Sequence, residues 1–265
     1  MDTILRYFRF GCRIDKRPIN ETSRSTSRQH PLLGILKAQG KSNPLTEIHF
    51  FDIYRSANIG IFLRASENFC LVPAGLPNTK TDKIVEMLRV KAIPASIAGS
   101  RLIGPLSVIN SKGIILSRLS DDVEVKNLSE TTGQNVLRLE SRFTSVGNLI
   151  AANDHGAVIS DVFSDESAKE VGKALEVPVR KMRIGSYIQV GAMISTTNSG
   201  ALVHPVATET ELREIGETLG FDPEPATVNG GVPFVSSGIV GNTMGVLVGT
   251  LTRGSELVIL GRAFG

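Results

Sequence analysis

One hydrophobic pattern occurs five times along the chain: an apolar stretch, a short polar turn and a second apolar stretch. The copies cover residues 59–73, 103–117, 146–160, 190–205 and 236–249. Two short apolar stretches joined by a turn of polar residues and glycine are typical of a β-hairpin. The pattern therefore predicts five hairpins.

The turns of these hairpins recur 43 to 45 residues apart, which indicates tandem structural repeats. A glycine ends four of the turns, and Phe69 holds the equivalent place in the first copy; the glycines are Gly113, Gly156, Gly200 and Gly245. Three turns open with asparagine, at Asn110, Asn153 and Asn242. We assign the asparagines to hydrogen bonds within their own turns and the glycines to backbone with positive φ.

A helix is expected after each hairpin. Ser164 and Thr208 each stand eight residues after a turn glycine and are predicted N-caps, and Thr208 with Glu211 has the spacing of a capping box. Apolar residues at helical spacing follow both caps. Thr79 is predicted to cap the first helix, with its stripe at Ile84, Val85 and Leu88. The second helix (120–128) is expected to be weak and the fifth (255–260) short.

A third strand closes each unit, as in residues 92–97, 136–143, 179–184 and 225–228. One such ββαβ unit is too small to bury an adequate core alone, so the five are expected to share one. An open stack of repeats needs polar ends, whereas the last unit ends in apolar residues, 263–265. We predict an α/β fold: a single domain over residues 48–265, with five ββαβ repeats arranged as a closed ring of pseudo-fivefold symmetry.

Charge divides the chain into two parts. Residues 1–47 carry nine basic and four acidic side chains, which leaves 20 basic and 22 acidic in residues 48–265. A body with this balance is not expected to bind a partner through a large basic face. The basic extension, 1–47, has little apolar periodicity and is predicted to be disordered. Its origin is open between a start-site artefact, a disordered tail that touches RNA, a transit-like signal and a neutral extension.

Composition excludes several classes of site. Two cysteines, Cys12 and Cys70, are too few for a disulfide framework or a cysteine-rich zinc site, and they fit a reducing compartment. The uncharged stretches 184–208 and 225–252 contain no apolar run near the ~20 residues of a membrane span. Neither a phosphate-binding loop nor a metal-binding cluster is present in the sequence. We therefore expect no cofactor, no metal and no membrane.

Four segments resemble translation initiation factor 6, especially its archaeal form: residues 95–104 (ASIAGSRLIG), 145–149 (SVGNL), 190–205 and 227–231 (TVNGG). The resemblance covers about residues 48–265 and implies the pentein fold. It also implies a cytoplasmic, monomeric, non-enzymatic factor. Such a factor binds the large ribosomal subunit, mainly through a ribosomal protein on its intersubunit face, and blocks the small subunit. A role in large-subunit maturation stays open, as does contact between the basic arm and ribosomal RNA.

The sequence departs from that family in three places. The family has little counterpart to residues 1–47. The second and third hairpins end in Leu116-Ser117 and Ile159-Ser160, where archaeal relatives often have proline. The last unit, at residues 250–256, is less acidic than is common there.

A set of mostly polar residues falls where one unit passes to the next, and in a ring these junctions lie on the same side. We predict that they bind the partner; they are Asn58, Ser100, Arg101, Gly147, Asn148, Ser186, Tyr187, Asn229 and Gly230. Arg101 and Tyr187 are the expected anchors, since Arg and Tyr are enriched at interface hot spots. The alternative is that the set caps strands or lines a wet central channel.

Two other functions stay open. Pentein relatives include guanidine-modifying enzymes with a cysteine nucleophile and a histidine base, so a hydrolase or transferase is the alternative. Those enzymes carry the nucleophile near the C-terminus, whereas no cysteine follows Cys70 here, and His204 is assigned a structural role. We therefore predict no catalytic residue. A scaffold that binds some other partner is the third possibility.

Overall fold

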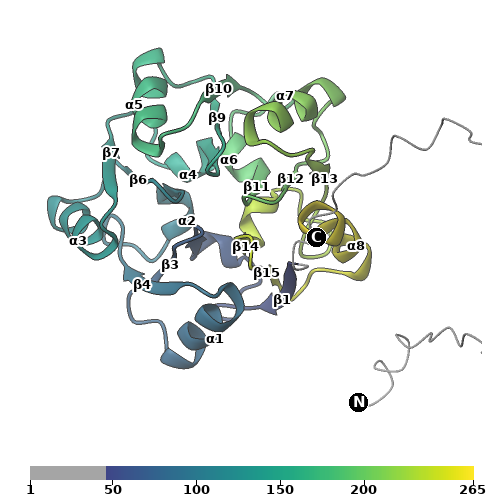
Figure 1. Ribbon diagram of the computed structural model, residues 1–265, viewed down its shortest axis with the longest axis horizontal. Coiled ribbons are helices and arrows are strands. Elements are labelled where there is room, and N and C mark those ends of the chain that lie inside the picture. Colours follow the sequence, from purple (N-terminus) through teal and green to yellow (C-terminus); the bar gives the residue numbers. More distant parts are fainter. Residues whose placement is uncertain (1–45) are drawn as a thin grey trace, which may run out of the picture. The chain divides into compact units, whose positions relative to one another are not determined.

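The computed structural model describes residues 46–265 (Figure 1). The predicted disorder of residues 1–47 concerns positions that lie outside the described residues, except for Thr46 and Glu47. Glu47 is the first residue of a strand, β1. Within residues 46–265, no helix combines the length and apolar character needed to cross a membrane.

The expected ββαβ repeat is present five times. Each three-stranded sheet consists of an antiparallel hairpin and a third strand that runs parallel to the second hairpin strand. The sheets are β2 (Arg64–Ala65), β3 (Phe69–Pro73) and β4 (Lys91–Ala95); β5 (Ser107–Ile109), β6 (Gly113–Ser117) and β7 (Asn135–Leu139); β8 (Ile150–Ala152), β9 (Ala157–Ser160) and β10 (Val179–Met182); β11 (Ile194–Thr196), β12 (Ala201–Val203) and β13 (Glu224–Pro225); β14 (Ile239–Gly241), β15 (Gly245–Gly249) and β1 (Glu47–Phe51).

The fifth sheet takes its third strand from the start of the described chain. β1 pairs in parallel with β15, from Glu47 opposite Gly245 to Phe51 opposite Gly249. The sequence pattern had assigned no third strand to this unit. The first and last repeats are thereby joined by main-chain hydrogen bonds, and the repeats follow one another around a common centre (Figure 1).

Five outer helices of equal length separate the sheets: α1 (Asn78–Leu88), α3 (Asp122–Thr132), α5 (Asp165–Leu175), α7 (Glu209–Leu219) and α8 (Gly254–Phe264). The predicted caps Ser164 and Thr208 are confirmed, and Glu211 completes the capping box. The weak second helix and the short fifth helix were wrong predictions, because Asp121 with Glu124 caps α3 and Glu256 binds the Arg253 amide that begins α8.

The first helix also differs from its prediction. Its N-cap residue is Pro77, whereas Thr79 lies inside the helix. Ile84 and Leu88 are buried as expected, but Val85 is 39% exposed. The fixed φ of proline suits the entry to a helix without a side-chain cap.

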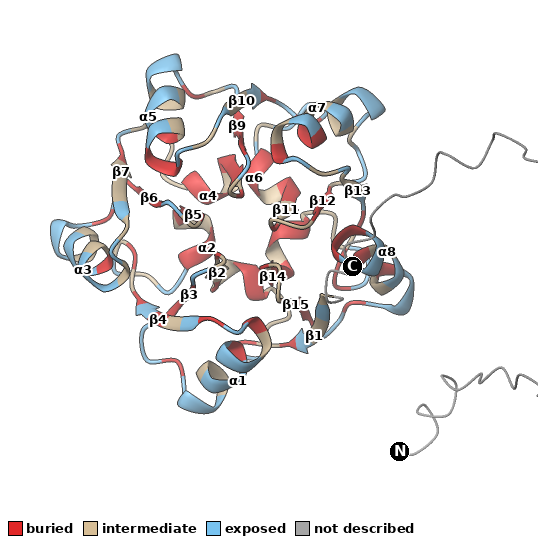
Figure 2. Cartoon of the chain, viewed as in Figure 1, coloured by how far each residue is buried: buried red, intermediate tan, exposed pale blue. Residues whose placement is uncertain are grey.

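Each predicted first hairpin strand begins as a helical turn instead. These inner turns are η1 (Ile59–Ile61), α2 (Ile103–Leu106), α4 (Val146–Leu149), α6 (Val190–Met193) and η2 (Val235–Ser237), and each contacts the next in cyclic order. They are mostly buried at the centre of the ring, whereas the outer helices expose one face (Figure 2). These inner turns are closely packed, since a Cβ built on Gly104 would lie 1.8 Å from the Gly60 carbonyl oxygen.

The hydrophobic core is divided into clusters that cross repeat boundaries. One cluster joins Val108 and Ile115 of the second repeat to Val171 and Leu175 of α5 in the third. Each outer helix therefore buries its apolar face between two neighbouring sheets, which explains why a single unit has no complete core of its own.

The turn glycines have a different role from the one predicted. None of Gly113, Gly156, Gly200 and Gly245 has positive φ. Instead, a helix of the next repeat ends against each turn: a Cβ on Gly113 would lie 2.0 Å from the Ala174 carbonyl oxygen, and one on Gly200 would lie 1.6 Å from that of Ala263. The glycines are required by close approach between repeats.

Candidate partner-binding face

The topology places all turns between repeats at one end of the strands. The third strand of each repeat runs parallel to the second, so the chain leaves both at the same end, where the outer helices also begin. We call this surface the junction face; its turns are residues 53–56, 97–100, 140–145, 184–187 and 228–232. The hairpin turns and the helix C-termini form the opposite surface, the hairpin face.

Four of the five junction turns are closed by a β-bridge, the exception being residues 140–145. Ile97 pairs with Ser100 and Ile184 with Tyr187, with similar bridges at 53–56 and 228–232. Left-handed backbone occurs in these turns even at residues with side chains, with φ of 52° at Tyr54 and 54° at Ala98. Three of them are two-residue turns, at 53–56, 97–100 and 184–187, and such turns have few alternative conformations.

Most of the predicted partner-binding residues lie on or beside this face. Ser100, Arg101, Ser186, Tyr187 and Gly230 belong to the junction turns or directly follow them, and all are at least partly exposed. Asn58 precedes η1, and Asn148 lies in α4 beside a surface groove of about 370 Å³ that Arg142 and Phe143 also line.

Gly147 and Asn229 lie beneath the surface instead. Gly147 is buried in α4, where a Cβ would come within 1.9 Å of the Gly104 carbonyl oxygen. The Asn229 side chain is buried and bridges the fifth repeat to the first, since its Nδ2 donates to the carbonyl oxygen of Ala57 at 2.9 Å. Their place in the sequence did not distinguish them from exposed turn residues.

Aromatic contacts hold the two expected anchors in place. The Arg101 guanidinium lies 5.6 Å from the centre of the Tyr54 ring, which belongs to the preceding turn. Tyr187 packs against the rings of His204 and Phe234, with centres 5.8 Å and 6.2 Å away. Burial lowers the pKa of His204, and its Nδ1 accepts a hydrogen bond from the Val206 amide, so the ring is neutral near pH 7.

The junction face also exposes large apolar side chains that the sequence analysis did not single out. They stand in the junction turns or between a second strand and the following helix: Tyr54, Leu102, Leu119, Val206 and Leu251. Their exposures run from 41% for Tyr54 to 64% for Leu251. A large apolar residue inside a polar turn was the available signal, and such patches mark interaction surfaces.

Five arginines on this face form no ion pair with any residue in 46–265: Arg55, Arg101, Arg118, Arg142 and Arg253. Others nearby are paired, such as Arg183 with Asp161 at 2.7 Å. Uncompensated guanidinium groups beside exposed aromatic rings are available for hydrogen bonds with a partner.

The first strands of all five repeats line a cavity of about 50 Å³ at the centre of the ring. Arg64 extends into it and donates to the carbonyl oxygens of Gly104, Ser107 and Gly147, at 3.0 to 3.3 Å. Burial lowers the pKa of Arg64 to about 10, so the guanidinium stays charged at neutral pH. It links the first repeat to the second and third, a role that the sequence analysis missed.

The geometry does not support Cys70 as the nucleophile of a cysteine-dependent enzyme, and Cys12 lies outside the described residues. Cys70 lies fully buried in β3, and burial raises its pKa to about 12, so the thiol is protonated and a poor nucleophile at neutral pH. As far as residues 46–265 form it, the lining of the central cavity contains no His, Cys, Asp or Glu. In the same residues no cluster of such side chains is arranged to hold a metal ion.

Helix-capping glutamates also bind the junction turns, among them Glu211 and Glu256. Glu211 accepts hydrogen bonds from the amides of Thr208 and Gly185, and Glu256 accepts them from Arg253, Gly230 and Gly231. Burial alone would raise the pKa of both carboxyls, but these donors outweigh it and lower the pKa below the ordinary value of 4.5.

Acid is expected to weaken the fold through these two groups. Because their pKa is lower in the folded chain, their contribution to stability is complete above about pH 4.5 and is lost as the pH falls through the folded-state values. Urea unfolding between pH 3 and 6 should show a free energy of unfolding that declines toward acid. The Glu211→Gln, Glu256→Gln double variant should decline less steeply, and equal slopes would contradict the assignment.

Comparison with known proteins shows which family this chain matches. The model described as the eIF-6 family matches residues 48–263. Translation initiation factor 6 of Cenarchaeum symbiosum (strain A) is 44% identical over 218 residues, covering 82% of this chain and 99% of that protein. The factor of Nitrosopumilus maritimus (strain SCM1) is 44% identical over 214 residues, covering 81% and 97%.

Among solved structures, the chain resembles a mutant N-terminal domain of ArgZ, a cyanobacterial arginine dihydrolase, bound to its substrate. The TM-score is 0.50 at 14% sequence identity, covering 71% of this chain and 76% of that one. Identity at this level indicates a shared fold alone, and that fold is the predicted pentein ring.

Proposed function

The chain belongs to the eIF-6 family, whose members are translation initiation factors, and from this membership we propose that it binds the large ribosomal subunit through its junction face and prevents the small subunit from joining. We further propose that it acts in the cytoplasm as a monomeric binding protein without enzymatic activity. A role in large-subunit maturation would use the same bound state.

One observation supports the choice of face: exposed apolar side chains surround the same turns as arginines that form no ion pair within residues 46–265. Arg101 and Tyr187 are the proposed anchors, because both residues are exposed and both contact neighbouring rings. The flanking contacts are proposed to come from Asn58, Ser100, Asn148, Ser186 and Gly230. Gly147 and Asn229 support the face from below.

The proposed mechanism is occlusion. The apolar content of the junction face and the net charge of −2 over residues 48–265 favour a protein surface over a phosphate-rich one, so we assign the main contact to a ribosomal protein on the intersubunit face. A ring stabilised by contacts between all neighbouring repeats occupies a fixed volume there. Contact between the basic extension and ribosomal RNA stays a proposal about residues outside the described part.

Sucrose-gradient sedimentation tests this function. Purified protein should shift joined ribosomes toward free subunits and sediment with the large one. Arg101→Glu combined with Tyr187→Ala should weaken this shift by roughly a hundredfold in concentration, as expected when two hot-spot side chains are lost. Lys112→Glu reverses an exposed charge on the hairpin face and should leave it unchanged.

Unchanged joined ribosomes at saturating wild-type protein would overturn the proposal, as would sedimentation with small subunits alone. Equal loss of activity in Lys112→Glu would reject the choice of face.

A further inference from the structure

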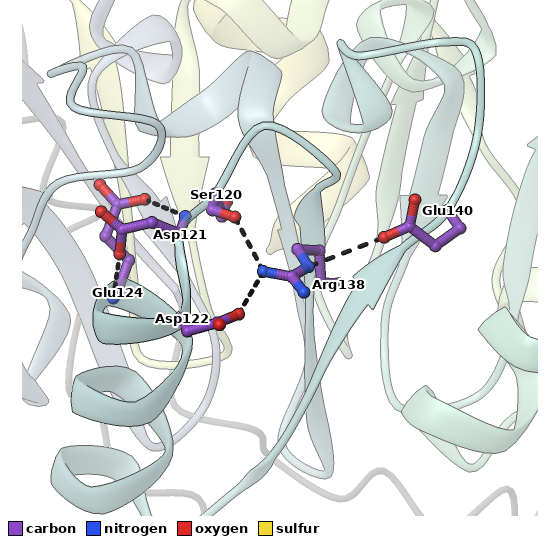
Figure 3. A network of polar contacts seen from close by, with 6 residues as sticks. All are labelled: Ser120, Asp121, Asp122, Glu124, Arg138 and Glu140. Atoms are coloured by element: carbon purple, nitrogen blue, oxygen red, sulfur yellow. Dashed lines mark hydrogen bonds and ion pairs between the residues drawn. The ribbon is translucent and has the colours of Figure 1, made fainter.

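In three of the five repeats, one glutamate in the first turn of the outer helix has two sets of hydrogen bonds. Glu124 accepts from the Asp121 amide, which closes the capping box of α3, and from the amides of Ala98 and Gly99 at 2.7 and 2.9 Å (the capping box is drawn in Figure 3). Glu211 joins the Thr208 amide to that of Gly185 in the same manner.

Glu256 forms the largest set. Its carboxylate accepts from the amides of Arg253, Gly230 and Gly231 and from the Thr227 hydroxyl, at 2.7 to 3.0 Å. Each of the three carboxylates therefore connects the start of an outer helix to a junction turn 25 or 26 residues away in the chain.

The turns held in this way contain left-handed backbone. Ala98 has φ of 54° and Asn229 has φ of 52°. At Ala98 and Asn229, which carry a Cβ, this conformation costs roughly 1–2 kcal/mol, and an interaction from outside the turn offsets that cost. In the third turn the left-handed residue is Gly185, with φ of 58°, which has no such cost. Charged acceptors form strong hydrogen bonds with amides and provide that interaction.

The remaining two repeats lack this arrangement. In the first, Lys80 donates instead to the main-chain oxygen and carboxylate of Asp52, at 2.8 Å each. In the third, the corresponding helix position is Ser167, and its described side-chain contact is with the cap Ser164. The glutamate contacts coincide with the three turns that carry or adjoin Arg101, Tyr187 and Gly230.

We infer that Glu124, Glu211 and Glu256 are positioning residues for the junction face: they hold these turns in the binding conformation before a partner arrives. The inference rests on the proposed function, because it concerns affinity for the large ribosomal subunit. A surface ordered in advance loses less conformational entropy on binding, which increases affinity without any new contact. The glutamates themselves need not touch the partner.

Glu211→Gln tests this with Ser164→Ala as the matched control. Both changes weaken the acceptor at the start of an outer helix: glutamine keeps one acceptor oxygen but loses the charge of Glu211, and alanine removes the Ser164 hydroxyl, which caps α5 alone. Glu211→Gln should weaken binding to purified large subunits roughly tenfold, whereas Ser164→Ala should leave affinity unchanged although it lowers the melting temperature. Equal affinities of Glu211→Gln and wild type would overturn the inference.

A double-mutant cycle separates positioning from general destabilisation. If Glu211 acts through the turn that presents Tyr187, its substitution should have little further effect on affinity once Tyr187→Ala has removed the anchor. Hydrogen exchange at the Gly185 amide should accelerate in Glu211→Gln and not in Ser164→Ala. Additive losses of affinity, or unchanged exchange at Gly185, would contradict the inference, whereas failure of the wild-type protein to bind large subunits would reject the proposed function itself.

Discussion

Gly147→Ala is expected to lower the free energy of unfolding by roughly 3–5 kcal/mol, the range of severe core defects. The added Cβ would lie 1.9 Å from the Gly104 carbonyl oxygen and 2.6 Å from that of Ser107, both main-chain atoms. No side-chain rotation relieves such a clash, so α4 has to move away from α2. Because the inner turns contact one another in a closed circle, that shift is opposed by the other repeats.

Movement of α4 also disturbs the centre of the ring. Arg64 donates to the carbonyl oxygens of both Gly104 and Gly147, so separation of the two turns weakens at least one of these bonds. Urea unfolding followed by circular dichroism measures the change.

Gly261→Ala is the matched control for this prediction. Gly261 lies in α8 with no atom near the position of an added Cβ, so alanine should stabilise the helix by about 0.5–1 kcal/mol. A Gly147→Ala protein as stable as wild type would show that the inner turns are not closely packed. The same result would restore Gly147 as a surface contact.

Asn153→Ala is expected to lower the free energy of unfolding by roughly 3–5 kcal/mol, because it leaves several buried polar groups without partners. Asn153 is buried, with only 4% of its surface exposed. Its Oδ1 accepts from the amides of its own turn, and its Nδ2 donates to the carbonyl oxygens of Thr197 and Leu219 in the next repeat. One side chain thus forms a turn, connects two hairpins and caps α7.

Two further variants make this prediction specific. Asn68→Ala removes an asparagine from the hairpin face whose side chain makes an exposed hydrogen bond to Ser111, and it should change stability by less than about 0.5 kcal/mol. Asn153→Asp keeps the acceptor but places a carboxylate opposite two carbonyl oxygens, so it should be at least as destabilising as alanine at pH 7. Thermal unfolding of the three proteins ranks them, and equal losses in Asn68→Ala and Asn153→Ala would contradict the prediction.

Asn153 and its equivalents also explain how the repeats recognise one another. The side chains of Asn110 and Asn242 donate to the carbonyl oxygens of Leu175 and Leu88, at the ends of α5 and α1. The sequence pattern correctly placed these asparagines in turns. Their second role was not visible, because the helix that each one caps belongs to the following repeat.

The period of the sequence was enough to predict the repeat and its order of elements. Alternating apolar stretches define hairpins locally, and Ser164, Thr208 and Glu211 define helix starts within four residues of chain, so each signal is complete in the sequence. The predictions for the second and fifth helices were wrong for different reasons. The capping box of Asp121 with Glu124 is a local signal that the prediction did not use, whereas Glu256 at the start of α8 also binds the amides of Gly230 and Gly231, which lie far back in the chain.

The candidate face was likewise predicted only in part from the sequence. Position in the repeat was sufficient to place Arg101 and Tyr187 on the same face. Every junction follows the third strand of a repeat, and these strands all end at that face. It was not sufficient to separate Gly147 and Asn229, which are buried, from their exposed neighbours. Burial of these two depends on carbonyl groups and side chains contributed by other repeats.

The sequence alone therefore determined the features whose signal lies within a few neighbouring residues or recurs at a fixed interval. These are the five ββαβ units, their turns and most of their caps. Tertiary structure alone decided the helical backbone of the inner turns, the use of β1 to complete the fifth sheet, the insertion of Arg64 and the reason for the turn glycines. Each of these depends on atoms of a neighbouring repeat that come within van der Waals or hydrogen-bonding distance only when the ring closes. Such contacts lie 40 or more residues apart in the chain, where no local pattern records them.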